Sequence, residues 1–316
     1  MVQPCFAWTP RVTVGRSNRR SNHAENLEKS DDVILDVPTF DRYLALCLGL
    51  QGSDIVALFS LRLDETGTDG RSPIMVVAGA VATIDQWAAL EASWNKLLSR
   101  SKINAYHWKE FNDVNNDVFG GWSLLKKQRF VAAQEKILNK NVMFRVAVGV
   151  DCATHLSVKK RMKGISGFDT NSDYSLALRW LMFYTCEHLV VADRDARLAV
   201  LVEDGPWSSG AASAYQKVAA MTNGPSAKHA HRLAGFASSP KGRRSLEAAD
   251  YIAGTSLFKI SNRNHNSKKK NQLSVLLGEP ELESWYCGML EVKKKRREHH
   301  DRVRKASILS KSEQSS

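Results

Sequence analysis

Asp64-Glu65-Thr66-Gly67 is the stretch of sequence that decides the fold of this chain. The two acids follow an apolar run from Val56 to Leu63, in which apolar and polar side chains alternate. A glycine ends this run, and a second, more continuous apolar run follows from Ile74 to Ile84. Alternation predicts a strand with one buried face, and the continuous run predicts a central strand. The sequence therefore predicts a strand that ends in carboxylates, a tight turn and a return strand.

Further strands and helices follow along the chain. Their apolar periods predict an α/β fold, because strands and helices alternate. The expected elements are a helix after Thr83 that carries Trp87 to Leu98, a helix at Ser123–Asn139, a strand at Val142–Val150, a long apolar helix at Tyr174–Val191, a strand at Leu198–Val202, a short helix at Ala211–Met221, an edge strand at Arg232–Phe236 and a helix at Leu246–Ile260.

The two ends of the chain differ in character from its middle. Residues 1–55 are predicted to be a weakly structured, flexible extension, because they mix prolines with Ser, Arg and Asn and show no period. Residues 56–262 are predicted to form one domain. Residues 263–316 are predicted to be a basic C-terminal tail that contains the cluster Lys293–Arg297.

The composition favours a polyanionic partner. The 316 residues carry a formal net charge of +12, which favours nucleic acid first and an anionic membrane surface second. A soluble protein with a basic tail is the alternative explanation. The five cysteines are scattered without a close CxxC pair, which argues against a zinc ribbon and favours a cytoplasmic location. No apolar stretch predicts a membrane span, and the sequence does not predict an oligomeric state.

Acids end three of the predicted strands. They are Asp64, Asp151 and the pair Glu203 and Asp204. A fourth acid, Asp250, lies in the middle of an apolar helical stripe, where a lone carboxylate is costly and needs a partner. Several carboxylates are what a site for two divalent cations requires, and Mg²⁺ and Mn²⁺ prefer oxygen ligands. We therefore predict a site that holds two Mg²⁺ or Mn²⁺ ions.

Each acid also has a structural explanation. Asp64 could form an ion pair with Arg62 on the same strand face, and Glu65 is expected to stabilise the turn. Asp151 could instead cap a following helix. The sequence does not decide between Glu203 and Asp204 as the metal ligand.

The chain resembles the ribonuclease H-like fold, and more narrowly the bacterial and phage family called domain of unknown function 3800. Four segments between residues 56 and 262 carry the resemblance. They are Asp64-Glu65-Thr66-Gly67, the strand Val76–Val81 with Trp87 and Trp94, the segment His107-Trp108-Lys109-Glu110-Phe111 followed by Phe119–Trp122, and Leu246-Glu247-Ala248-Ala249-Asp250-Tyr251-Ile252-Ala253.

The resemblance implies a mixed sheet flanked by helices and a nuclease-like metal site. In the family the residue at Glu110 is Asp, and the one at Thr66 is Ser. Glu110 is therefore an additional candidate for the site. His107 is a candidate general base or phosphate contact, and its alternative role is a structural hydrogen bond.

Basic residues precede and follow the Asp250 helix. Lys241, Arg243 and Arg244 are the predicted substrate contacts, because cations beside a metal site can follow a phosphate backbone. The resulting hypothesis is a metal-dependent nuclease that hydrolyses phosphodiester bonds of DNA or RNA. The alternatives are a non-catalytic nucleic-acid-binding scaffold with the same fold and a transposase-like strand-transfer enzyme.

Overall fold

A mixed sheet forms the centre of the computed structural model, which describes residues 58–68, 70, 72–161, 172–192, 196–221, 230–261 and 272–277. Within this part of the chain the sheet has six strands in the order β5-β4-β1-β2-β3-β6. β2 is antiparallel to both of its neighbours, and the other pairs are parallel. The strands are β1 (Leu58–Thr66), β2 (Ile74–Thr83), β3 (Phe144–Asp151), β4 (Arg197–Glu203), β5 (Leu233–Ser239) and β6 (Gln272–Leu277).

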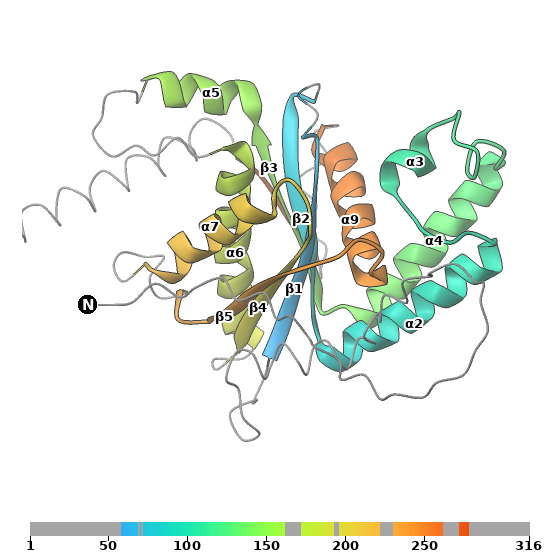
Figure 1. The fold of residues 1–316 in the computed structure, drawn as a ribbon, viewed down its shortest axis with the longest axis horizontal. Coiled ribbons are helices and arrows are strands. Elements are labelled where there is room, and N and C mark those ends of the chain that lie inside the picture. The colour runs from blue at the N-terminus through green and yellow to red at the C-terminus, as the bar shows by residue number, and fades with distance from the viewer. Residues whose placement is uncertain are drawn as a thin grey trace, which may run out of the picture. The chain divides into compact units, whose positions relative to one another are not determined.

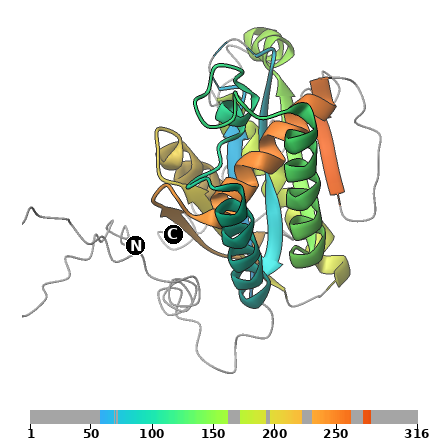
Figure 2. The same ribbon diagram turned by 90° about the vertical axis from the view of Figure 1, so that its right-hand side faces the viewer.

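Helices cover both faces of the sheet (Figure 1). α9 packs directly on β1 and β2 on one face, with α2 and α4 beside it, and α6 packs on β2 and β3 on the other (Figures 1 and 2). No helix among the described residues is long and apolar enough to cross a membrane. The helices are α2 (Ile84–Ser101), α3 (Trp108–Asn112), α4 (Leu124–Asn141), α5 (Cys152–Arg161), α6 (Asp173–Ala192), α7 (Ser208–Ala219) and α9 (Arg244–Ser261).

Alternation along β1 assigns its side chains to the two faces. Leu61 and Leu63 are buried in the core cluster that includes α6. Arg62 points to the opposite face, where it is fully buried and donates to Glu91 Oε1 at 2.8 Å and to Ser245 Oγ at 2.6 Å. The period of two therefore puts Asp64 on the α9 face and Glu65 on the α6 face.

The predicted fold class is confirmed as an α/β protein with a mixed sheet flanked by helices. The eight predicted elements after the β1–β2 hairpin correspond to α2, α4, β3, α6, β4, α7, β5 and α9. Of the two residues that could cap α2, Thr83 and Asp85, Thr83 is the N-cap and forms a capping box with Gln86. The predicted N-terminal extension and the cluster Lys293–Arg297 lie outside the described residues.

Three elements were not expected from the sequence. α3 has only five residues, and α5 has little amphipathic character, so neither shows a clear period. β6 lies beyond residue 262, the predicted end of the domain, and pairs in parallel with β3 at the sheet edge. Its pairing partner is far away in sequence, and local pattern does not reveal such a partner.

Candidate active site

Asp64 and Glu203 lie side by side at one edge of the sheet. β1 and β4 are parallel neighbours, and their register pairs Leu63 with Val202. The next residue of each strand is therefore an acid, and both acids point to the α9 face, because Leu63 and Val202 are both buried against α6. The carboxyl ends of these two strands thus bring two carboxylates together.

Asp250 comes from α9, which covers this face of the sheet. Its neighbours Ala249 and Ala253 are buried, and such small side chains allow the close packing of α9 on β1 and β2. Its Oδ2 accepts a hydrogen bond of 2.7 Å from the backbone N–H of Trp108, the first residue of α3. This bond links the predicted His107–Phe111 segment to the acid that the sequence singled out.

Burial and mutual repulsion perturb these acids. Burial first, and then the charges of Asp250 and Glu203, raise the pKa of Asp64 to about 7, although the N–H of Glu65 donates to its Oδ1 at 2.8 Å. Burial also raises the pKa of Asp250 to about 7. The bond from Trp108 opposes this shift, and the charges of Glu203, Glu247 and Glu65 add to it. An ion pair between Asp64 and Arg62 would lower the pKa instead, so the structure does not support that explanation.

Glu65 belongs to the same electrostatic group although it points to the other face. Burial, followed by the charges of Asp64 and Glu203, raises the pKa of Glu65 to about 8. The turn after it depends on Gly67, which has a φ of +79° and whose missing Cβ would lie 2.3 Å from the carbonyl oxygen of Ile74. A side chain does not fit there, which explains the glycine of the Asp64–Gly67 stretch.

The three predicted cationic contacts differ in their surroundings. Lys241 is 71% exposed, and its Nζ lies 3.7 Å from Glu203 Oε2. Arg244 bonds the carboxylate of Glu247 and donates from Nε to Asn95 Oδ1 at 2.7 Å, so it joins α9 to α2. Arg243 is partly buried just before α9. Of the three, Lys241 is the cation that the structure brings to the acids.

The remaining predicted acids lie elsewhere. Asp151 Oδ1 accepts from the N–H of Thr154 at 2.8 Å and therefore caps α5. Asp151 lies on β3, two strands away from β1, and four residues beyond Ala147, which is level with Asp64 across the sheet. This register implies a separation of about 16 Å between Asp151 and Asp64. Asp204 follows Glu203 and is exposed, and its backbone N–H donates to Ser239. These positions separate Asp151 and Asp204 from the group of Asp64, Glu203 and Asp250.

The His107 segment lies near the group through Trp108. His107 is half-buried, precedes α3 and makes no capping bond with its side chain. Glu110 is exposed on α3. Tyr106, which directly precedes His107, is buried and belongs to an aromatic cluster with Trp94, Phe111 and Tyr251. The segment is thus anchored on the core, and its backbone positions Asp250.

The donor set suits divalent cations of the Mg²⁺ type. Asp64, Glu203 and Asp250 offer only carboxylate oxygens, and bound cations would offset the repulsion that helps to raise the pKa values of Asp64 and Asp250. As the side chains stand, no group of three or more His, Cys, Asp or Glu residues in the described part of the chain is arranged to hold a metal ion. Glu203 is directed to Lys241, so metal binding requires this carboxylate to turn.

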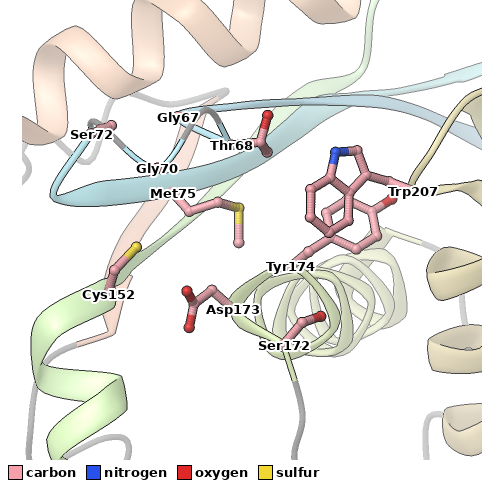
Figure 3. A pocket seen from close by; sticks show the side chains of 10 residues that line it. All are labelled: Gly67, Thr68, Gly70, Ser72, Met75, Cys152, Ser172, Asp173, Tyr174 and Trp207. Atoms are coloured by element: carbon pink, nitrogen blue, oxygen red, sulfur yellow. The ribbon is translucent and has the colours of Figure 1, made fainter.

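A pocket of about 210 Å³ lies beyond the turn that follows Asp64 and Glu65 (Figure 3). It is on the α6 face, and sequence reasoning missed it because its walls come from distant segments. The signal for this pocket in the sequence was Trp207, an aromatic residue just after the end of the strand that carries Glu203. The lining residues are Gly67, Thr68, Gly70, Ser72, Met75, Cys152, Ser172, Asp173, Tyr174 and Trp207.

Comparisons with known proteins give little beyond this geometry. No family model matches the chain, and no curated protein matches it. Two solved structures do: a mutant protein of Bst-RNase HIII, with a TM-score of 0.36, and Bst-RNase HIII in complex with Mn²⁺, with a TM-score of 0.35. Each is 16% identical, and the match covers 69% of this chain but only 56% of theirs. Likenesses this weak carry no argument about this chain, and its mixed sheet is described by its own strand order and strand directions.

Proposed function

We propose that this protein is a metal-dependent nuclease that hydrolyses phosphodiester bonds of DNA or RNA. One observation carries the proposal: three acids from β1, β4 and α9 gather on one face at one edge of the sheet, and the charge of Glu203 helps to raise the pKa values of Asp64 and Asp250. Partly buried carboxylates with raised pKa values are costly to the fold, and such costs concentrate at functional sites.

Asp64, Glu203 and Asp250 would hold the cations. Two Mg²⁺ or Mn²⁺ ions bound there would activate a water molecule and stabilise the leaving oxygen. The chain's own contribution is positional. Trp108 fixes Asp250 through its backbone N–H, and the Gly67 turn fixes the end of β1 that carries Asp64.

Lys241 has two roles in this proposal, as the ion-pair partner of Glu203 and as a phosphate contact. In the absence of cations it neutralises Glu203 across 3.7 Å. When Glu203 turns to the metal, the exposed ammonium group becomes free to contact a phosphate of the substrate. Arg243 remains a proposed phosphate contact, whereas the bonds of Arg244 to Glu247 and Asn95 favour a structural role.

We further propose that the chain belongs to the family called domain of unknown function 3800. Supporting this, segments that carry the resemblance meet in space. Trp108 donates to Asp250, and Trp94 donates from Nε1 to Glu247 Oε2 at 3.1 Å. These two bonds join the His107–Phe111 segment and α2 to the Asp250 helix.

A cleavage assay that compares the wild-type protein with variants of its acids tests the function. The full chain is incubated with single- and double-stranded DNA and RNA in Mg²⁺, Mn²⁺ or EDTA. Glu203→Gln and Asp250→Asn are expected to lower the cleavage rate roughly 100-fold or more, because even indirect supports of a metal site cost 10–100-fold. Asp204→Asn is the matched control: it removes an adjacent charge that is exposed and outside the group, and cleavage should persist.

Each other outcome contradicts a named part of the proposal. Binding without cleavage by the wild-type protein in every cation would favour the scaffold alternative. Joining of strands in place of hydrolysis would favour the transposase-like alternative. Cleavage that survives Asp250→Asn would show that the catalytic acids lie elsewhere.

A further inference from the structure

The pocket beside the acids is built from segments that converge at the same edge of the sheet. Gly67 and Thr68 directly follow the acids of β1, and Trp207 lies four residues after Glu203. Burial first, and then the charges of Glu65 and Asp64, raise the pKa of Tyr174 in the pocket wall. The pocket and the acid group are therefore neighbours, on opposite faces of the end of β1.

One wall of the pocket is aromatic. The rings of Tyr174 and Trp207 lie 5.4 Å apart between centroids with 32° between their planes. Figure 3 shows these two rings at one side of the pocket, with Asp173 and Cys152 at the other side. Tyr174 is buried, and Trp207 is partly exposed. A rigid aromatic pair with an accessible outer ring suits the stacking of a planar ligand.

The charged group of the pocket, the carboxylate of Asp173, is a hydrogen-bond acceptor. The Asp173 carboxylate bonds His155 Nδ1. Burial by itself would raise the pKa of Asp173, but the bonds from His155 and from the Cys152 thiol keep this pKa below its usual range. The hydroxyl of Ser72 donates to the carbonyl of Ile74 at 2.5 Å, and that of Ser172 donates to Ser175 Oγ at 3.0 Å. The hydroxyl protons of Ser72 and Ser172 are therefore already used, and the Asp173 carboxylate offers lone pairs to a ligand.

The size of the pocket also restricts the ligand. Its volume of about 210 Å³ is below the 300–1,000 Å³ that is usual for drug-sized ligands, so one ring system fits better than a larger molecule. The ligand is thus planar, small and carries a donor for Asp173. The exocyclic amines of adenine, cytosine and guanine supply such a donor, whereas the N3–H of uracil and thymine lies between two carbonyl oxygens that the Asp173 carboxylate repels.

We propose that this pocket binds one unpaired, amine-bearing nucleobase of the substrate strand, stacked on Trp207 and bonded to Asp173. The inference rests on the proposed function and deepens it. A base that is paired in a duplex presents neither its face nor its amine to such a pocket, so the substrate class is single-stranded nucleic acid with a preference for adenine, cytosine or guanine beside the scissile phosphate.

Binding to matched homopolymers tests the pocket without requiring cleavage. The anisotropy of labelled oligo(rC) and oligo(rU) of equal length is titrated with the full chain in EDTA. Wild-type protein should bind oligo(rC) about tenfold more tightly, since stacking and one good polar contact have that order of effect. Trp207→Ala should abolish most of the difference, and Trp207→Phe should restore it because the ring still stacks. Trp122→Ala, which removes a partly exposed Trp from the other face, is the matched control and should bind as the wild type does.

The outcomes separate the two proposals. Equal affinity of the wild-type protein for the two homopolymers, or an unchanged preference in folded Trp207→Ala, overturns the base pocket even if cleavage occurs. A Trp207-dependent preference in a protein that never cleaves supports the pocket and rejects the nuclease. Thermal unfolding of each variant establishes that it is folded, and if Trp207→Ala is not, the affinity of the wild-type protein for the two homopolymers remains the test.

Discussion

Asp64 illustrates at the scale of one residue how a site opposes the stability of its fold. Its carboxyl is buried near Asp250 and Glu203, and burial and these charges raise its pKa from 3.8 to about 7. Between about pH 4 and pH 7 the folded protein therefore keeps a proton on Asp64 that the unfolded chain has already released. In this window the stability of the metal-free protein falls as the pH rises.

Asp64→Asn removes the charge that causes this loss. We expect the variant to be more stable than the wild type at pH 8 by on the order of 1–2 kcal/mol in EDTA, with the difference vanishing below about pH 3, where the wild-type carboxyl is protonated in both states. Urea unfolding at the two pH values measures this. A variant that is less stable at pH 8 would show that Asp64 is stabilised in the metal-free fold by contacts stronger than the repulsion.

At the scale of elements, α9 and α3 meet at a glycine. A Cβ on Gly254 would lie 2.1 Å from the indole ring of Trp108. The backbone N–H of Trp108 donates to Asp250, which lies one turn earlier on α9. Helix α9 therefore fixes Trp108 twice, through a carboxylate and through the space left by a missing side chain. The closest packing of Gly254 is against this indole.

Gly254→Ala is expected to destabilise the protein by about 1–3 kcal/mol, the usual cost of overpacking, despite the better helix propensity of Ala. It should also lower cleavage, because displacing Trp108 releases Asp250. Gly210→Ala is the control on α7, since its Cβ would meet only the ring of Tyr174 at 3.9 Å. Thermal unfolding of both variants compares them, and equal behaviour would mean that Trp108 moves aside freely.

At the scale of the whole molecule, cation binding and folding are linked. The acids come from β1, β4 and α9, and only the folded chain brings them together. A cation that binds the folded chain alone stabilises it by about 2.7 kcal/mol at a concentration of 100 times its dissociation constant.

We therefore expect Mg²⁺ or Mn²⁺ to raise the midpoint of thermal unfolding of the wild-type protein, and the double variant Asp64→Asn, Asp250→Asn to lose this response. Asp151→Asn, about 16 Å from Asp64 by register, should keep it. A rise that persists in the double variant would place the cations at another site.

The sequence by itself determined most of the elements and the most informative acid. Alternation defined β1, the helical period defined α2 and α9, and the apolar stripe around Asp250 indicated a carboxylate that needed a partner. These properties are local, because they depend on residues within one strand or a few helical turns. The predicted domain boundaries, cytoplasmic location and ligand roles remain predictions.

Only the tertiary structure decided which acids meet. Glu203, and not Asp204, faces Asp64, because strand register and the side-chain period of two fix the face on which each residue lies. Asp151 has the same local pattern but lies two strands away, and Arg244 finds Asn95 at a separation of 149 residues. The Trp207 pocket likewise needs several segments together. Such contacts arise from packing between elements, which sequence spacing does not encode.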